Sequence, residues 1–254
     1  MTKKLNSNAI KLIAIIAMTI DHIAWAIYTG YSTSAVAIIM HLIGRITCPI
    51  MCFCVAEGFH YTKNIKKYAT RLLIFAMISH IPYMLQSLAF REFGWLALIP
   101  FATGNGFMGH ILNQTSVMWA LFIGLLMLIV NDSEKISNKF KPIIIILLCL
   151  VSFPSDWSCI ASLFILCIGA NRGNPTKQIL WCGFYAILYA LIYFICIDKV
   201  YGIIQLGVIL ALPIIYLYNG QRGSNPKVNN FMKWFLYLYY PLHLMLIGIL
   251  LIIL

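Results

Sequence analysis

The sequence predicts an all-α integral-membrane protein that crosses the bilayer about nine times. Of its 254 residues, 62% are hydrophobic and only 10% are charged, a balance that water-soluble domains lack. The apolar residues fall into runs of a length suited to membrane helices, separated by short polar segments. The basic residues gather in alternate polar segments. We therefore expect residues 1–254 to form a single integral-membrane domain, with the bilayer as its solvent.

The apolar runs predict nine spans, with a possible tenth. We expect crossings at 10–28, 37–59, 72–89, 116–131, 142–154, 157–170, 179–196, 201–218 and 234–254. The fifth run is short, because a helix needs about 20 residues to cross a bilayer, so a broken pair with the sixth around Pro154 is an alternative. The segment 90–115 is rich in glycine and aromatic residues, and the sequence leaves open whether it spans, re-enters or lies on the surface.

The distribution of cations predicts a cytoplasmic N-terminus. In that orientation, all but three of the 18 Lys and Arg residues lie on the inner side; the exceptions are Arg45, Arg91 and Lys199. This asymmetry follows the positive-inside rule. The net charge of +11 is then explained by topology and anionic lipid, and we expect no nucleic-acid partner. The eight cysteines fall in or beside apolar spans without metal-site spacing, so we interpret them as packing residues and expect neither disulfides nor a metal.

The first span carries ionisable residues deep in its apolar run. Asp21 and His22 are adjacent, so on a helix they point about 100° apart and each needs partners on other helices. Lys11 lies eleven positions before His22, which places the two on one face about 16 Å apart along the axis. Intramembrane charges are expensive and therefore suggest function. The alternative is a snorkelling lysine and a structural histidine.

The second span adds an arginine at comparable depth. His41 and Arg45 are four residues apart and share a helical face. A guanidinium inside a membrane needs a carboxylate, carbonyls or a ligand, and Asp21 is the partner we expect. This pair could serve catalysis or only fix helix packing. Pro49 is expected to kink the helix and free a carbonyl.

The inner end of the second span begins the densest polar stretch of the chain. Cations, a histidine and aromatic residues recur there at helical spacing, a composition that suits a polyphosphate with an attached base or arm. It is not a P-loop, and an ordinary basic inner loop is the alternative. The candidate ligands are Glu57, His60, Lys63, Asn64, Lys67, Tyr68 and Arg71.

Several further polar residues are secondary candidates. His80, near Pro82, is expected in the bundle interior. Asp156 is predicted either to cap the sixth span or to hold an acceptor at the outer side. Pro241 is expected to break the last span. A glycine-rich segment at 104–113 suggests a lid, a re-entrant loop or a plain connector. The remaining candidates are His41, Asn219, Tyr240 and His243.

Several stretches of the chain resemble the TraX family of conjugation-associated membrane proteins, which is linked to acetylation of the pilin N-terminus. The matching stretches are Leu12–Ile23, Gly44-Arg45 with Pro49, Glu57–Asn64 with Tyr68 and Arg71, Leu217–Gly220, and Lys233–Phe235 with Tyr240–His243. The resemblance implies a polytopic acetyltransferase of the cytoplasmic membrane, related in architecture to the acyltransferase-three and heparan glucosaminide N-acetyltransferase groups. In those groups a basic residue and a histidine on one early helix serve the acyl-CoA and the acceptor, an arrangement that Lys11 and His22 fit.

We therefore predict an acetyl-CoA-dependent membrane acetyltransferase. The nucleotide would dock at the basic inner cluster, and the pantetheine arm would pass Lys11. His22 would act as general base or carry the acetyl group itself, with Asp21 and Arg45 orienting the site. The acceptor is an amine or hydroxyl of a peptide, glycan or lipid headgroup, with a pilin-like N-terminus implied by the resemblance. The alternative is a proton-coupled transporter or an export or assembly partner. The sequence leaves the oligomeric state open.

Overall fold

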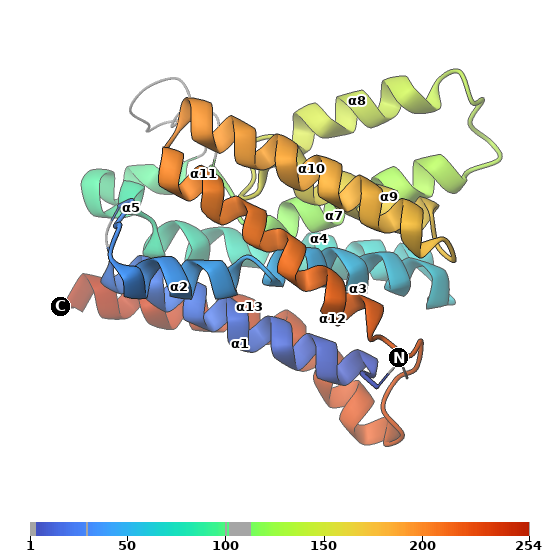
Figure 1. The fold of residues 1–254 in the computed structure, drawn as a ribbon, viewed down its shortest axis with the longest axis horizontal. Helices are drawn as coiled ribbons and strands as arrows, with labels where there is room; N and C mark the ends of the chain where they lie inside the picture. Colours follow the sequence, from blue (N-terminus) through green and yellow to red (C-terminus); the bar gives the residue numbers. More distant parts are fainter. Residues whose placement is uncertain (1–3, 29, 100, 102–112, 254) are drawn as a thin grey trace.

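The computed structural model describes residues 4–28, 30–99, 101 and 113–253. Within these residues the chain is built from α-helices and two short 3-10 helices, and it contains no β-strand beyond isolated bridges. Figure 1 shows the long helices lying side by side along the longest axis, with the two termini at opposite ends of the bundle. The predicted all-α helix bundle is confirmed.

The helices follow the predicted spans closely. Among the described residues, six helical stretches are long and apolar enough to cross a membrane, and three shorter apolar helices accompany them. The helices of the third and the last predicted spans begin earlier than predicted. Their first turns contain cations, and a hydropathy pattern does not count charged residues as part of a span. The elements are α1 (Ser7–Ile27), α2 (Ala35–Gly44), α3 (Thr47–Tyr61), α4 (Ile65–Gln86), α5 (Leu88–Phe93), η1 (Gly94–Leu98), α7 (Val117–Asp132), α8 (Lys141–Ser152), α9 (Ser158–Ala170), α10 (Pro175–Cys196), α11 (Lys199–Gln205), η2 (Leu206–Leu210), α12 (Ala211–Tyr216) and α13 (Pro226–Ile253).

Apolar side chains cover both the inside and the outside of this bundle. Buried residues of α3, α4, α7 and α9 form one continuous core. Large apolar side chains are also exposed along α8 and α10, including Ile146, Leu150, Leu180 and Ile187. A soluble monomer rarely exposes so continuous an apolar surface, whereas a lipid bilayer covers it without cost. The protein is a multi-pass membrane protein.

The second predicted span is interrupted where the sequence indicated a kink. α2 ends at Gly44 and α3 begins at Thr47. Pro49 has no N–H to donate, and its ring crowds the carbonyl four residues earlier, which belongs to Arg45. Gly44 also allows close approach of α1, because a Cβ at this position would overlap the side chain of Asp21. The break and the close contact together bring Arg45 beside Asp21.

The last predicted span is not broken, contrary to expectation. α13 continues through Pro241 from Pro226 to Ile253. Proline leaves the carbonyl of Tyr237, four residues earlier, without its usual donor, a loss that membrane helices tolerate. On the same helix, Nδ1 of His243 donates to the carbonyl of Tyr239 at 2.7 Å. α13 therefore presents Tyr240 and His243 from a continuous helix.

The fifth and sixth predicted spans are two short helices, α8 and α9, with a turn between them. The turn between them is held to the start of α7 by two hydrogen bonds of 2.8 Å, from Gln114 N to Pro154 O and from Asp156 N to Thr115 O. The backbone of Trp157 is left-handed, with φ of 65°, and Trp157 occupies the N-cap position of α9 without a side-chain capping bond. The alternative role of Asp156 as that cap is wrong, and its side chain lies against a cavity instead.

Candidate functional site

A buried network of charged side chains joins α1 to α2, as the sequence predicted. Nη2 of Arg45 donates to both carboxylate oxygens of Asp21, at 2.8 and 3.0 Å. Nδ1 of His41 donates to Oδ1 of the same carboxylate at 2.8 Å. Nη1 of Arg45 donates to Oε1 of Gln205, on α11, at 3.1 Å. The charges of Asp21 and Arg45 thus have the partners that burial demands, while Nε2 of His41 is enclosed without a hydrogen-bond partner.

His22 faces away from this network, toward α13. Its ring lies 5.0 Å from that of His243 and 6.3 Å from that of Tyr240, measured between centroids. Among the described residues, no hydrogen bond reaches either ring nitrogen of His22; Nδ1 is enclosed, and Nε2 is the nitrogen left accessible. Nε2 of His243 is likewise enclosed and unpartnered. Buried polar groups are normally hydrogen-bonded, so the unpartnered nitrogens of these two neighbouring rings are candidates for chemistry or ligand binding.

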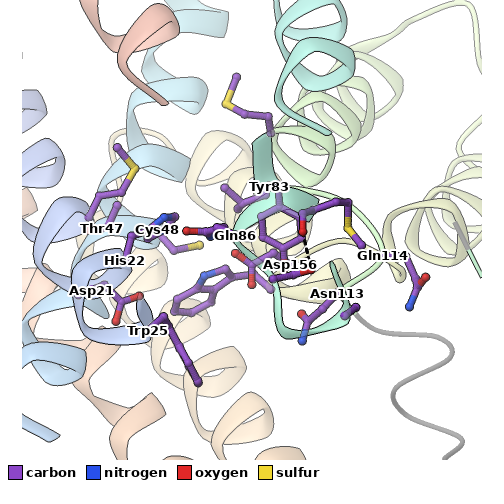
Figure 2. Close-up of a pocket in the computed structure, with 18 of the residues that line it drawn as sticks. Asp21, His22, Trp25, Thr47, Cys48, Tyr83, Gln86, Asn113, Gln114 and Asp156 are labelled. Carbon is purple, nitrogen blue, oxygen red and sulfur yellow. Dashed lines mark hydrogen bonds between the residues drawn. The ribbon is translucent and has the colours of Figure 1, made fainter. Parts of the chain in front are cut away.

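A cavity of about 600 Å³, which we call the histidine cavity, opens beside His22. Its volume is that of a small-molecule site. Figure 2 shows His22 and Cys48 on one side and Tyr83 and Asp156 across from them. The walls are aromatic and polar, and they include Asp21, His22, Trp25, Arg45, Thr47, Cys48, Tyr83, Gln86, Glu92, Asn113, Asp156, Trp157, Tyr193 and Tyr240. The three predicted catalytic residues, Asp21, His22 and Arg45, therefore line one cavity.

Asp156 is the carboxylate that faces this cavity from the α8–α9 turn. Burial raises the pKa of Asp156 to about 6, although the guanidinium of Arg45 opposes the shift. Arg45 also lies over the ring of Trp157, 5.1 Å from its centroid. A partly desolvated carboxylate beside aromatic rings is suited to hold an ammonium group.

A second cavity of about 150 Å³, which we call the basic cavity, lies farther along α1. Lys11, Arg71, Arg222 and Lys233 line it. Three residues, Met51, Met118 and Leu121, line both this cavity and the histidine cavity. The two cavities are therefore neighbours, and we call the three lining residues that they share the neck. Lys11 and His22, predicted to share a face of α1, line the basic and the histidine cavity respectively.

The predicted polyphosphate cluster at 57–71 is divided by the fold. Of the seven predicted ligands, only Tyr68 and Arg71 line the basic cavity. Glu57 accepts from Nε of Arg172 at 2.9 Å, and His60 donates to the carbonyl of Gly169 at 3.1 Å, so both contact the end of α9. The side chain of Asn64 caps α4, and Lys63 and Lys67 are exposed outside the cavity.

The secondary candidates have different positions. His80 binds Thr115 Oγ1 at 3.2 Å and Leu98 O at 3.0 Å, which ties α4 to the segments that follow. Asn219 accepts from the backbone of Gln221, in a turn, and His41 belongs to the Asp21 network. Tyr240 lines the histidine cavity. Residues 104–112 of the predicted lid lie outside the described part of the chain.

Sequence reasoning missed two cations of the basic cavity, Arg222 and Lys233. Arg222 lies in the segment before α13, and Lys233 lies in the second turn of that helix. Only the packing of α13 against α1 and α4 brings them beside Lys11 and Arg71. The one signal available in the sequence was an excess of inner cations without neighbouring carboxylates.

These features define a class: a multi-pass helical membrane protein with a buried charge network and an imidazole facing an internal cavity. The model of the TraX protein family matches residues 6–251, so the chain belongs to the TraX protein family.

The chain is similar to a Dichelobacter nodosus protein described as a probable fimbrial assembly protein, FimC, serogroup H1. The two are 28% identical over 243 residues, which cover 94% of this chain and 92% of that protein. An uncharacterized Rickettsia prowazekii protein is 38% identical over 72 residues, or 28% of this chain and 25% of its own length. No solved structure matches the chain significantly.

Proposed function

We propose that the protein is a membrane acetyltransferase, which moves an acetyl group from cytoplasmic acetyl-CoA to an amine at the membrane. The observation that carries this proposal is the unpaired imidazole of His22 in a cavity that adjoins a basic one. An imidazole without a partner can accept a proton from a nucleophile. A basic cavity offers charge complementarity to the phosphates of an acyl donor. Membership in a family linked to pilin acetylation supports the same reaction.

The reaction can be balanced with His22 as the single proton carrier. The acceptor amine attacks the thioester carbonyl carbon, and the new C–N bond forms a tetrahedral oxyanion. Nε2 of His22 takes a proton from the amine. The C–S bond then breaks, and the CoA thiolate leaves and receives that proton from His22. The products are the N-acetylated acceptor and free CoA thiol, and the imidazole returns to its neutral form.

The Asp21–Arg45–His41 network has a supporting role in this proposal. Asp21 is bonded to two residues of the next helix, so the turn of α1 that carries His22 is fixed in position. Arg45 also lines the histidine cavity, and its positive charge favours the oxyanion that forms there. Asp21 neutralises much of that charge in the resting state, which allows Arg45 to remain buried.

A peptide N-terminus is the proposed acceptor, in a protein of the cytoplasmic membrane. The full-length relative is described as a fimbrial assembly protein, and fimbriae are built from protein subunits. Asp156 and the aromatic walls of the histidine cavity are suited to an approaching ammonium group, which must lose a proton before it attacks. A glycan amine or a lipid headgroup are the other acceptors with this chemistry.

Replacement of His22 tests the proposal. The purified chain in proteoliposomes is given radiolabelled acetyl-CoA and a pilin-like peptide with a free N-terminus. His22→Ala should reduce transfer by about 10²–10⁴-fold, the usual contribution of a general base. His80→Gln is the matched control, because His80 lines neither cavity. Transfer by His22→Ala at the wild-type rate, in a protein with unchanged thermal unfolding, contradicts the proposal.

A proton-coupled carrier is the second candidate. The close pair of buried imidazoles, His22 and His243, favours it, because such groups can relay protons. CoA separates the two functions: an acetyltransferase is stabilised against thermal unfolding by CoA through mass action, whereas a carrier without a CoA site is not.

A further inference from the structure

The four cations of the basic cavity have no anionic partner in the described part of the chain. The ion pairs present there join Asp21 to Arg45 and His41, and Glu57 to Arg172. The charged groups that act on Lys233 are instead Arg71, Arg222 and Lys11, and all of them are positive. Nε of Arg71 is enclosed without a hydrogen-bond partner. Like charges held around one small cavity repel each other, and an anion placed between them relieves that repulsion.

Hydrogen bonds between distant parts of the chain fix this arrangement. Nδ2 of Asn8 donates to Oδ1 of Asn229, and Nδ2 of Asn229 donates to the carbonyl of Gly223, both at 2.7 Å. The backbone N–H of Ser7 donates to the carbonyl of Gln221 at 2.9 Å. These bonds connect the start of α1, the first turn of α13 and the segment that carries Arg222. The cations are therefore brought together by a specific structure and not by chance proximity on a mobile surface.

The geometry also indicates the shape of the anion. Arg222 is exposed, whereas Lys11, Arg71 and Lys233 are half-buried, so the cavity opens toward Arg222. At its other end the shared residues Met51 and Met118 lead to the histidine cavity. Lys11 and His22 are about 16 Å apart along α1, about half the thickness of the hydrocarbon core. A ligand that contacts both cavities therefore has a charged end, a long neutral arm and a reactive tip.

We propose that Lys11, Arg71, Arg222 and Lys233 bind the phosphates of the CoA donor, whose neutral arm passes the neck between Met51 and Met118 toward His22. This inference rests on the proposed function for the identity of the donor. It replaces the exposed Lys63 and Lys67, which the sequence suggested, with Arg222 and Lys233 as phosphate ligands. The headgroup of an anionic phospholipid has the same phosphate chemistry, and the lipid comparison below distinguishes the two sources.

CoA binding to charge-neutral variants tests this site. The full chain is studied in nanodiscs of phosphatidylcholine, and CoA affinity is measured by calorimetry for the wild type, Arg222→Gln, Lys233→Gln and the double variant. Each single variant should weaken binding several-fold, and the double variant by at least about tenfold, because phosphate contacts with cations are charge-assisted. The double variant Lys63→Gln/Lys67→Gln removes the same charge from the same end of the bundle and should bind CoA as the wild type does.

Several results would overturn the inference. They are an absence of CoA binding to the wild type, equal affinity of the Arg222→Gln/Lys233→Gln variant, or an equal loss in the Lys63→Gln/Lys67→Gln control. Nanodiscs with phosphatidylglycerol provide the lipid comparison. If this lipid displaces CoA at low mole fraction in a way that depends on Arg222 and Lys233, the cavity is a lipid site and the inference fails.

The same variants separate this inference from the proposed function. If CoA binds with the expected dependence on Arg222 and Lys233 but no acetyl transfer occurs, the proposed function fails and the phosphate site stands. If acetyl transfer occurs and the double variant keeps the wild-type KM for acetyl-CoA, the phosphate site fails and the function stands. The His22→Ala variant should lose transfer but keep wild-type affinity for CoA.

Discussion

The two cavities differ in how the charges in their walls are compensated. In the wall of the histidine cavity, Asp21 and Arg45 compensate each other through two short hydrogen bonds, with His41 as a third partner. Around the basic cavity, four cations face each other, and none forms an ion pair with a described carboxylate. The compensated network needs no ligand to balance its charge, whereas an anion would relieve the repulsion around the basic cavity. Under the proposal, charge balance therefore distinguishes a supporting network from a phosphate-binding site.

The largest expected effect comes from breaking the compensated network. Arg45→Met leaves the carboxylate of Asp21 buried with only His41 as a partner, and removal of one member of a buried pair costs about 3–5 kcal/mol. The free energy of unfolding in detergent micelles measures this loss. The double variant Asp21→Asn/Arg45→Met removes both charges and should recover much of the stability. No recovery in the double variant would show that the two side chains are not energetically coupled.

The next prediction concerns the neck that joins the cavities. Met118→Trp enlarges a side chain that lines both cavities, so under the proposal the acyl group can no longer reach His22 in the productive geometry. Transfer should fall by about 10²-fold, because small displacements of reacting groups cost that much. Met77→Trp, on the exposed face of α4, is the control and should leave transfer unchanged. If Met118→Trp transferred acetyl at the wild-type rate, the proposal that the donor passes Met118 to reach His22 would be wrong.

Asp156 provides a smaller effect that depends on pH. Because burial raises the pKa of Asp156 to about 6, above the unfolded value of 3.8, ionisation opposes folding. The wild type should lose stability as the pH rises from about 4 to about 6 and lose no more above it. Asp156→Asn cannot ionise, so it should be more stable than the wild type by about 3 kcal/mol near neutral pH and about equally stable near pH 4. Thermal unfolding across this range measures the difference, and a constant difference at all pH values would contradict the assignment.

The smallest effect is expected at the ion pair between Glu57 and Arg172. The side chain of Arg172 is 40% exposed, and exposed pairs contribute less than about 1 kcal/mol. Glu57→Gln should therefore change thermal stability only slightly and leave the affinity for CoA unchanged. A tenfold loss of CoA affinity in this variant would instead show that Glu57 contributes to CoA binding, and would contradict its assignment to a structural ion pair.

The sequence predicted the histidine side of the site better than the basic side. Asp21 and Arg45 lie at similar depth in consecutive helices, so their pairing follows from topology alone. Arg222 and Lys233 reach Lys11 only because α13 packs against α1, a contact between opposite ends of the chain that hydropathy does not encode. Helical spacing predicted that the polar residues of 57–71 lie together. In the structure, the turn between α3 and α4 separates their side chains.

The proline residues illustrate a second limit of sequence reasoning. Pro49 lies in the first turn of α3, just after the break in its span, whereas Pro241 lies inside the continuous helix α13. Which outcome occurs depends on side chains that surround the freed carbonyl, and these are known only once the helix is built.

The most direct test of the central claim is transfer between the two sides of a membrane. Proteoliposomes are loaded with radiolabelled acetyl-CoA, and an impermeant pilin-like peptide with a free N-terminus is added outside. We expect labelled peptide to accumulate outside with the wild type and to be lost with His22→Ala and with Met118→Trp. Acetylation that requires donor and peptide on the same side, or that persists without His22, would contradict a reaction in which the two substrates meet inside the helix bundle.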